Sequence, residues 1–472
     1  MPTCRCIVLA LLLVVTCQRD ASAHDALPAT RTVEQTLIDA GENRAELERA
    51  LREIEDAFRP GMTFLITYMP PTDAATLDAD FLLTNVRQAY EARARVPWGD
   101  RVPDEIFFND VLPYASVSEP REAWRESLME QFLEHVTECA TPAEAAQRLN
   151  RVIFPALGVR YSTKRARADQ SPSESIAQGM ASCTGLSILL TNGCRATCIP
   201  ARLAGIPEWP HKGGNHTWVE VWSDGTWYFT GAAEPSDQGL NHAWFNGDAA
   251  RADVNSRAHS IYATSWQHTG VTMPMVWAAD ADPVPAVNVT SRYTGQDETT
   301  ADDTAQCYVR VVHAETGARI ATTVHLTYDM MDSAVLADRS RDETFDLNDM
   351  ATFDVPLGAA ATIILPDYPD VLSTTVSIDT PTRTVTITVP REPDDAETVQ
   401  ALQRIASDLR GAFHNELWGT GVRPPFQGAE HVLNTHEDAV RALVWSEYQS
   451  APIHFPFHKD FNADRVRIGH AQ

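Results

Sequence analysis

The spacing of apolar residues changes along this chain, and that change constrains the fold more than any other feature. From roughly Thr30 to Arg151 apolar residues recur every three to four positions, which predicts helices. Residues 173–245 combine one helix with strands rich in β-branched and aromatic residues. From Asp302 to Pro390 short segments alternate with a period of two, which predicts a small antiparallel sandwich. The sequence therefore predicts an α+β protein of several domains.

Charge and hydropathy argue against two classes of protein. The formal net charge of -26 would repel a phosphate backbone, so general nucleic-acid binding is not expected. No segment reaches the ~20 consecutive apolar residues of a membrane-spanning helix, so an integral membrane protein is not expected either.

The first 23 residues have the pattern of a secretory signal peptide. A cationic start at Arg5 is followed by an apolar stretch from Ile7 to Thr16 and by the small-residue site Ala21-Ser22-Ala23. We therefore expect export to the periplasm, the cell envelope or the medium. A lipoprotein anchored at Cys17 is the less favoured alternative, because Thr16 fits a lipobox poorly.

The cysteine count indicates a free thiol. Of the eight cysteines, three lie in the signal peptide. The five that remain are Cys139, Cys183, Cys194, Cys198 and Cys307. Since five is odd, an oxidising compartment would leave at least one of them free or paired with another molecule.

Cys183 has the context of a nucleophile. Leu186, Leu190, Cys194 and Cys198 follow it at four-residue spacing, which predicts a helix with one buried face that starts at Cys183. Cys194 and Cys198 are then core residues. The unpaired N–H groups and the positive end of the dipole at a helix start stabilise a thiolate. Cys183 therefore lies at a position that favours the nucleophilic form of its side chain. Without a partner residue, a cysteine at such a position is more often structural than catalytic.

His216, which follows 33 positions after Cys183, is the candidate general base. It opens an alternating strand, "HTWVEVWS", that ends at the hairpin turn Asp224-Gly225. A neutral imidazole can take the thiol proton and later protonate a leaving amine. Gly213 and Gly214 just before it would let a substrate backbone approach.

A third residue should hold the imidazole in the right tautomer. Glu220 lies four residues along the same strand, roughly 13 Å away at ~3.3 Å per residue, which is too far for a hydrogen bond. Folding the hairpin at Asp224-Gly225 would bring Glu234 back beside His216, but the register is open by one residue. Asp237 and Asn241 are the reserve candidates.

These segments together resemble the transglutaminase-like core. "SCTGLSILLTNGCRATCIPARLAG" and "NHTWVEVWSDGTWYF" carry the resemblance, which extends over about residues 173–235. It implies a papain-like fold, Cys183 as nucleophile, His216 as base, and attack on an amide carbonyl with hydrolysis or transfer to an amine. The acidic residue that the family usually places before proline would fall at Gly231, so Glu234 lies about three residues late.

Further site residues are expected around this pair. The backbone N–H of Cys183 is the first candidate oxyanion donor, and Gln178 is the candidate side-chain donor. Trp218 and Trp209 are candidate walls of a substrate groove, although packing is the commoner role of such tryptophans. The histidines show no metal-ligand spacing, so neither a metal nor another cofactor is expected.

The expected organisation follows from these assignments. In chain order, the expected parts are a signal peptide (1–23), an N-terminal helical region (24–150), a transglutaminase-like catalytic core (151–293), an Ig-like or prealbumin-like β-sandwich (303–392) and a C-terminal helical segment (396–472). The acidic, Thr-rich segment 294–306 is the expected linker.

The expected function is that of a secreted cysteine enzyme that cleaves or transfers a peptide or side-chain amide through a thioester, with hydrolysis favoured. Its partner would be a protein or peptide substrate. One alternative is a catalytically inactive scaffold or binding module. Another is a structural Cys183 in a disulfide, for example with Cys139.

Overall fold

The computed structural model describes residues 31–278, 280–294, 304–329, 335–368, 371 and 373–390. The predicted signal peptide and the predicted C-terminal helical segment lie outside these residues, as does most of the predicted linker. The chain divides into two compact units. The first comprises Met1–Arg160 and Lys164–Gln296, and the second Tyr161–Thr163 and Asp297–Gln472.

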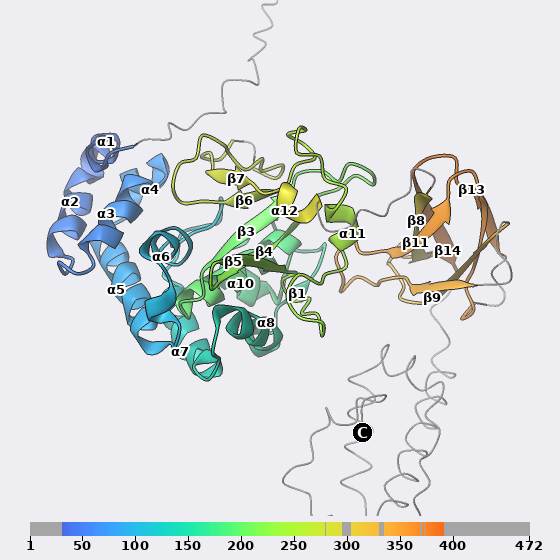
Figure 1. The fold of residues 1–472 in the computed structure, drawn as a ribbon, viewed down its shortest axis with the longest axis horizontal. Helices are drawn as coiled ribbons and strands as arrows, with labels where there is room; N and C mark the ends of the chain where they lie inside the picture. The colour runs from blue at the N-terminus through green and yellow to red at the C-terminus, as the bar shows by residue number, and fades with distance from the viewer. Residues whose placement is uncertain are drawn as a thin grey trace, which may run out of the picture. The chain divides into compact units, whose positions relative to one another are not determined.

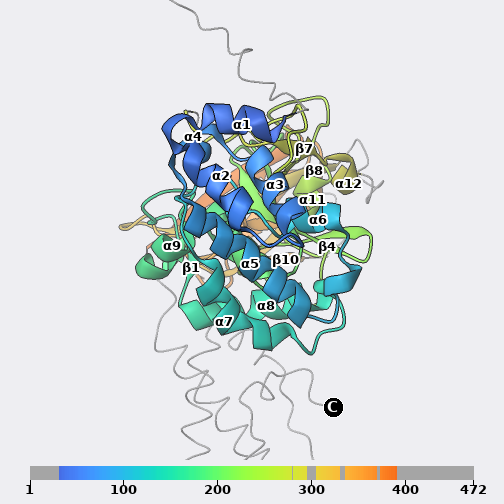
Figure 2. The same ribbon diagram turned by 90° about the vertical axis from the view of Figure 1, so that its left-hand side faces the viewer.

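The N-terminal part of the first unit is helical, as the periodicity predicts. Its helices gather on one side of the unit in Figure 1 and face the viewer in Figure 2. They are α1 (Val33–Asp39), α2 (Arg44–Glu53), α3 (Arg59–Thr67), α4 (Pro71–Thr76), α5 (Ala79–Arg95), α6 (Asp104–Asp110), α7 (Arg125–Val136) and α8 (Pro142–Leu157).

Helix α8 shows how local sequence sets a boundary. The Thr141 side chain accepts a hydrogen bond from the Glu144 N–H at 3.2 Å and caps the helix start. The helix ends at Gly158, whose φ of 66° is a left-handed conformation that glycine adopts without steric cost.

A five-stranded antiparallel sheet forms the centre of the first unit (Figure 1). Its spatial order is β5-β4-β3-β6-β7. The strands are β3 (Ala201–Ile206), β4 (His216–Ser223), β5 (Thr226–Thr230), β6 (Tyr262–Thr264) and β7 (Ala286–Asn288). The remaining elements of this part are β1 (Arg160–Tyr161), α9 (Pro172–Gln178), β2 (Met180–Ala181), α10 (Cys183–Ala196), α11 (Asn246–Ala249) and α12 (Ser291–Thr294).

Strand β4 is buried on both faces. On one side Ile188 of α10 packs in a cluster with Leu203 and Tyr262. On the other side Trp218 packs with Phe245 and further aromatic residues. Every residue of β4 is buried, so its alternation does not separate a core face from a solvent face. The strand is therefore held in place from both sides at the residues around His216.

Two buried arginines join the N-terminal helices to α10. The Arg125 guanidinium donates to Asn85 Oδ1 at 2.9 Å and to the Arg195 carbonyl at 2.8 Å. Arg195, also buried, donates in turn to the Ala115 carbonyl at 2.8 Å. Main-chain carbonyls thus satisfy both cations, and the helical region shares one compact unit with the sheet.

The second unit consists of two sheets around one core. The sheet orders are β10-β9-β12-β13 and β11-β8-β14. The strands are β8 (Thr304–His313), β9 (Thr323–Tyr328), β10 (Leu336–Arg339), β11 (Ala351–Pro356), β12 (Ala360–Ile364), β13 (Thr374–Ser377) and β14 (Thr382–Val389). Val309 and Phe353 of one sheet pack in the same cluster as Leu326 and Ile363 of the other, as expected of a sandwich.

The prediction of a purely antiparallel sandwich is wrong in one place. Strand β14 pairs with β8 in parallel, with Val385 opposite Val309. An alternating pattern shows which face of a strand is buried but not the direction in which it pairs, so the sequence carries no signal for this exception.

In the part of the chain that the structure describes, no helix is long and apolar enough to cross a membrane.

Candidate active site

Cys183 is the first residue of α10, as predicted. The Ser182 hydroxyl caps the helix by accepting from the Gly185 N–H at 3.1 Å, and it donates to the Ala168 carbonyl at 2.5 Å. The rest of α10, residues 184–196, is buried, whereas Cys183 is half-buried. The cap therefore fixes this thiol at the positive end of a buried 14-residue helix.

The first turn of α10 is bonded to the first residues of β4. Thr184 Oγ1 and Thr217 Oγ1 lie 3.0 Å apart, and the Ser187 hydroxyl donates to the Thr217 carbonyl at 3.1 Å. Thr184 follows Cys183 and Thr217 follows His216 in the chain. These two bonds therefore hold the two candidate catalytic residues at neighbouring positions.

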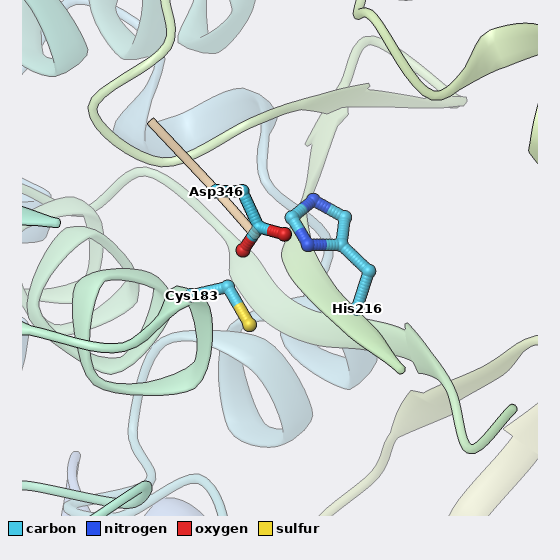
Figure 3. A group of neighbouring side chains, drawn as sticks. All are labelled: Cys183, His216 and Asp346. Atoms are coloured by element: carbon cyan, nitrogen blue, oxygen red, sulfur yellow. The ribbon is translucent and has the colours of Figure 1, made fainter. Parts of the chain in front are cut away.

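Cys183 and His216 lie side by side in the structure (Figure 3). Cys183 Sγ and a ring nitrogen of His216 are within 4.8 Å of each other. A base this near a nucleophile is placed to take its proton, and such contacts tighten further when substrate binds. Both residues belong to the first unit, whereas Asp346, which Figure 3 also labels, belongs to the second.

A tight loop precedes His216, the first residue of β4. The Trp209 N–H donates to the Gly214 carbonyl at 2.8 Å and closes the loop. Gly213 and Gly214 have φ values of 69° and 73°, which side chains other than glycine rarely adopt. The pair of glycines is therefore needed for the turn itself, and His216 then pairs with Ile206 of β3.

Aromatic rings surround the buried imidazole of His216. The ring centroids of Trp244 and Phe245 lie 4.8 Å and 4.9 Å from it. Trp218 and Trp209 follow at 5.8 Å and 6.4 Å in stacked orientations. This cage limits the positions that the imidazole can take and leaves it directed toward Cys183.

The two candidate groove residues lie in this cage. Trp218 is 0% and Trp209 1% exposed, and Trp218 Nε1 donates to the Tyr293 hydroxyl at 2.9 Å. Neither ring presents an exposed face to a substrate in the structure. Their role seen here is to pack around His216.

The predicted path of the hairpin is confirmed at its turn and wrong beyond it. Asp224 and Gly225 both have positive φ, as expected of the two central residues of a type I′ turn. The ladder of β4 with β5 ends at Val219 opposite Thr230 and does not continue to Glu234. The chain turns back on itself instead, through a bridge between Gly231 and Glu234.

Glu234 lies in the wall around His216. Trp244 Nε1 donates to the Glu234 carboxylate at 2.9 Å, and the Trp244 ring packs on the imidazole. A Cβ atom on Gly231 would lie 2.5 Å from Glu234 Oε2, so a larger residue here would displace this carboxylate. Its role as the orienting residue stays a prediction.

The two reserve candidates have other hydrogen-bond partners. Asp237 pairs with Arg151 at 3.0 Å, and its side chain is 82% exposed. Asn241 Oδ1 accepts from the Phe229 N–H at 2.9 Å, and its main-chain carbonyl accepts from the Asn246 amide at 2.7 Å. Both side chains therefore have a structural role in the segment that follows β5.

Gln178 is half-buried at the end of α9. Its side-chain oxygen accepts a hydrogen bond from the Ala166 N–H at 3.1 Å. The amide thus helps to order the chain before α10. Its proposed role as an oxyanion donor stays a prediction.

The sequence did not reveal a buried charge cluster beside the cage. Lys212 forms an ion pair with Asp248, and His211 Nε2 lies 2.8 Å from the same carboxylate. Burial alone would raise the pKa of Asp248, but the His211 hydrogen bond and the Lys212 charge hold it below its ordinary value. The Lys212 ammonium lies over the Trp209 and Trp244 rings, at 5.4 Å and 5.0 Å from their centroids.

The other thiols differ from Cys183 in their surroundings. None of the five cysteines that the structure describes forms a disulfide, so Cys183 and Cys139 are not joined. Burial raises the pKa of Cys194 and of Cys198 to about 12. It raises the pKa of Cys307 to about 11 and also raises that of Cys139. These four are therefore poor nucleophiles at neutral pH.

Comparison with known protein families supports the predicted transglutaminase-like core. Residues 130–232 match the model of the transglutaminase-like superfamily. This stretch of the chain is a transglutaminase-like domain. The match begins in α7 and includes Cys183 and His216, whereas Glu234 lies two residues beyond its end.

A search of solved structures gave a distant likeness. One similar chain is described as a candidate cysteine protease from Cytophaga hutchinsonii, with 20% identity and a TM-score of 0.20. The alignment covers 25% of this chain and 40% of that one, so the chain spans less than half of its length. A likeness of this size transfers no function. No curated protein matches the chain.

Proposed function

We propose that the transglutaminase-like domain is a cysteine acyl-transfer enzyme that acts on peptide or side-chain amides. The observation that carries the proposal is the Cys183 thiol at the start of α10 within 4.8 Å of a His216 ring nitrogen. Both residues lie in the matched part of the chain. A nucleophile next to a base, with that base held by surrounding side chains, is the arrangement that covalent acyl transfer requires.

The proposed reaction has two steps. His216 takes the thiol proton while Cys183 Sγ attacks the amide carbonyl, and the carbon–nitrogen bond then breaks as His216 protonates the leaving amine. The product is a thioester at Cys183. In the second step water, or an amine, attacks the thioester carbonyl, His216 takes its proton, and the thiolate leaves.

The helix start contributes to both steps. Backbone N–H groups in the first turn of α10 and its positive dipole end favour the thiolate and the oxyanion of the tetrahedral intermediate. Hydrolysis is the favoured outcome because water competes as acceptor at high concentration. In this proposal the enzyme acts after export on proteins or peptides.

The acyl-enzyme can be tested with an activated ester. With p-nitrophenyl acetate as probe, we expect a burst of about one nitrophenolate per chain, and one acetyl group on Cys183 by peptide mass mapping. Cys183→Ala should abolish the burst, whereas the matched control Cys139→Ala, a change at a buried thiol, should keep it.

Two outcomes would contradict the proposal. One is the absence of a burst from a folded wild-type chain, which would favour a catalytically inactive scaffold. The other is acetylation distributed over several thiols and unaffected by Cys183→Ala.

A further inference from the structure

Two buried charges lie beside the aromatic cage of His216. The side chains of Lys212 and Asp248 form an ion pair and are 1% and 7% exposed. Burial takes the ammonium and the carboxylate out of water, which is unfavourable unless each charge is paired. The two steps of the proposed reaction use neither charge.

Lys212 belongs to the loop that leads into His216. Gly213 and Gly214 follow it, and a Cβ atom on Gly213 would meet no described atom within 4 Å. Packing therefore does not restrain this part of the turn. Since His216 comes two residues after the glycines, its position depends on how the residues before them are anchored.

One carboxylate anchors both residues before the glycines. His211 Nε2 lies 2.8 Å from Asp248 Oδ1, and Lys212 pairs with Oδ2 of the same group. Burial alone would raise the pKa of Asp248, but these two partners keep it below its ordinary value, so the carboxylate is ionised at neutral pH. An ionised carboxylate can only accept, so the hydrogen in this bond is on His211 Nε2.

Asp248 also belongs to the segment that supplies two of the rings around His216. Trp244 and Phe245, whose ring centroids lie 4.8 Å and 4.9 Å from the imidazole, come just before α11, and Asp248 is the third residue of that helix. The Ala249 N–H donates to the Phe245 carbonyl at 2.8 Å. Asp248 therefore joins the loop before His216 to the segment that packs on it.

The Lys212 ammonium joins the same two parts of the chain. It lies 5.4 Å from the ring centroid of Trp209, in the loop, and 5.0 Å from that of Trp244, in the segment before α11. A cation is attracted to the faces of such rings, most strongly where water is excluded. Both ring centroids lie within 6.4 Å of the imidazole centroid of His216.

We propose that Lys212 and Asp248 are positioning residues: they hold the loop and the aromatic segment together, so that the His216 imidazole keeps its place beside Cys183. The inference rests on the proposed function and extends it to two residues outside the reacting pair. An apolar pair of similar size would fill the same space at similar stability. Apolar contacts are not directional, so only the charged pair fixes the loop against the segment.

The test replaces the ion pair by apolar residues of similar size, Lys212→Met together with Asp248→Leu. The rate constant for acetylation of Cys183 by p-nitrophenyl acetate should fall about 10–100-fold, because a displacement of ~1 Å can cost ~10²-fold in rate. Thermal unfolding should stay close to that of wild type.

The matched control replaces another largely buried ion pair of the first unit, Arg121→Met together with Asp73→Leu. These two side chains lie 3.0 Å apart and are 18% and 6% exposed. The control should acetylate Cys183 at the wild-type rate. A fall in rate equal to that of the Lys212→Met, Asp248→Leu chain would contradict the inference.

A double-mutant cycle separates positioning from a general loosening of the fold. If the ion pair acts through His216, its replacement in a His216→Ala chain should change the acetylation rate, followed by mass spectrometry, by less than about twofold. A loosened fold would instead slow the chains with and without His216 by the same factor, and that result would overturn the inference.

Asp248→Asn provides a second variant of almost unchanged shape. It removes the negative charge but keeps an oxygen that can accept from His211, and it should slow acetylation about tenfold or more with the same result in the cycle. Wild-type rates in both variants, with a slow His216→Ala chain, would overturn the inference and leave the proposed function standing. A wild-type rate in His216→Ala itself would overturn the proposed base and, with it, the inference.

Discussion

Replacement of His216 by Ala should slow the acetylation of Cys183 by about 10²–10⁴-fold, the usual contribution of a positioned general base. The imidazole has a ring nitrogen within 4.8 Å of Cys183 Sγ. Its removal leaves the thiol without the group proposed to accept its proton. The rate constant of the nitrophenolate burst, measured by stopped flow, gives the effect directly.

The matched control for this change is His242→Ala. His242 belongs to the same unit and is exposed. In the His242→Ala variant, Cys183 should become acetylated at the wild-type rate. If the burst rate constant of His216→Ala is within twofold of wild type, and its thermal unfolding is unchanged, then His216 is not the base.

Replacement of Glu220 by Ala should destabilise the first unit by about 3–5 kcal/mol, the typical cost of removing one partner of a buried ion pair. Glu220 is fully buried in β4 and accepts from Arg202 Nη2 at 2.7 Å and from the Tyr293 hydroxyl at 2.9 Å. Arg292 also donates to it. The substitution leaves the buried Arg202 cation without its carboxylate.

The effect can be measured as the change in the free energy of unfolding in urea. The control is Asp237→Ala, which removes an ion pair with Arg151 whose side chains are 41% and 82% exposed. Exposed pairs of this kind contribute about 0–1 kcal/mol, so the control should change little. Equal effects of the two substitutions would contradict the role assigned to Glu220.

The sequence predicts the reacting pair because local patterns determine it. The apolar spacing after Cys183 fixes the start of α10, and the alternation from His216 with the Asp224-Gly225 turn fixes β4 and its hairpin. The hydrogen bonds that join α10 to β4 involve Thr184 and Thr217, the neighbours of the two residues. Placing these two elements therefore places the pair.

The surroundings of the pair depend on contacts that no local pattern encodes. Strand β5 stops at Thr230 because the chain turns through Ala233, a non-glycine residue with a φ of 65°. Such a conformation is uncommon and carries no sequence signal. Asp248 pairs with Lys212 from 36 positions away, so the charge cluster also required the tertiary structure.

The most direct test of the Cys183–His216 pair is competitive alkylation of the native chain with limiting iodoacetamide at neutral pH, followed by peptide mass mapping. We expect Cys183 to be labelled first and His216→Ala to slow that labelling. The thiols whose pKa burial raises, Cys194, Cys198, Cys307 and Cys139, should become labelled only at higher pH or on unfolding. Equal labelling of Cys139 and Cys307 at neutral pH, with no effect of His216→Ala, would contradict the account.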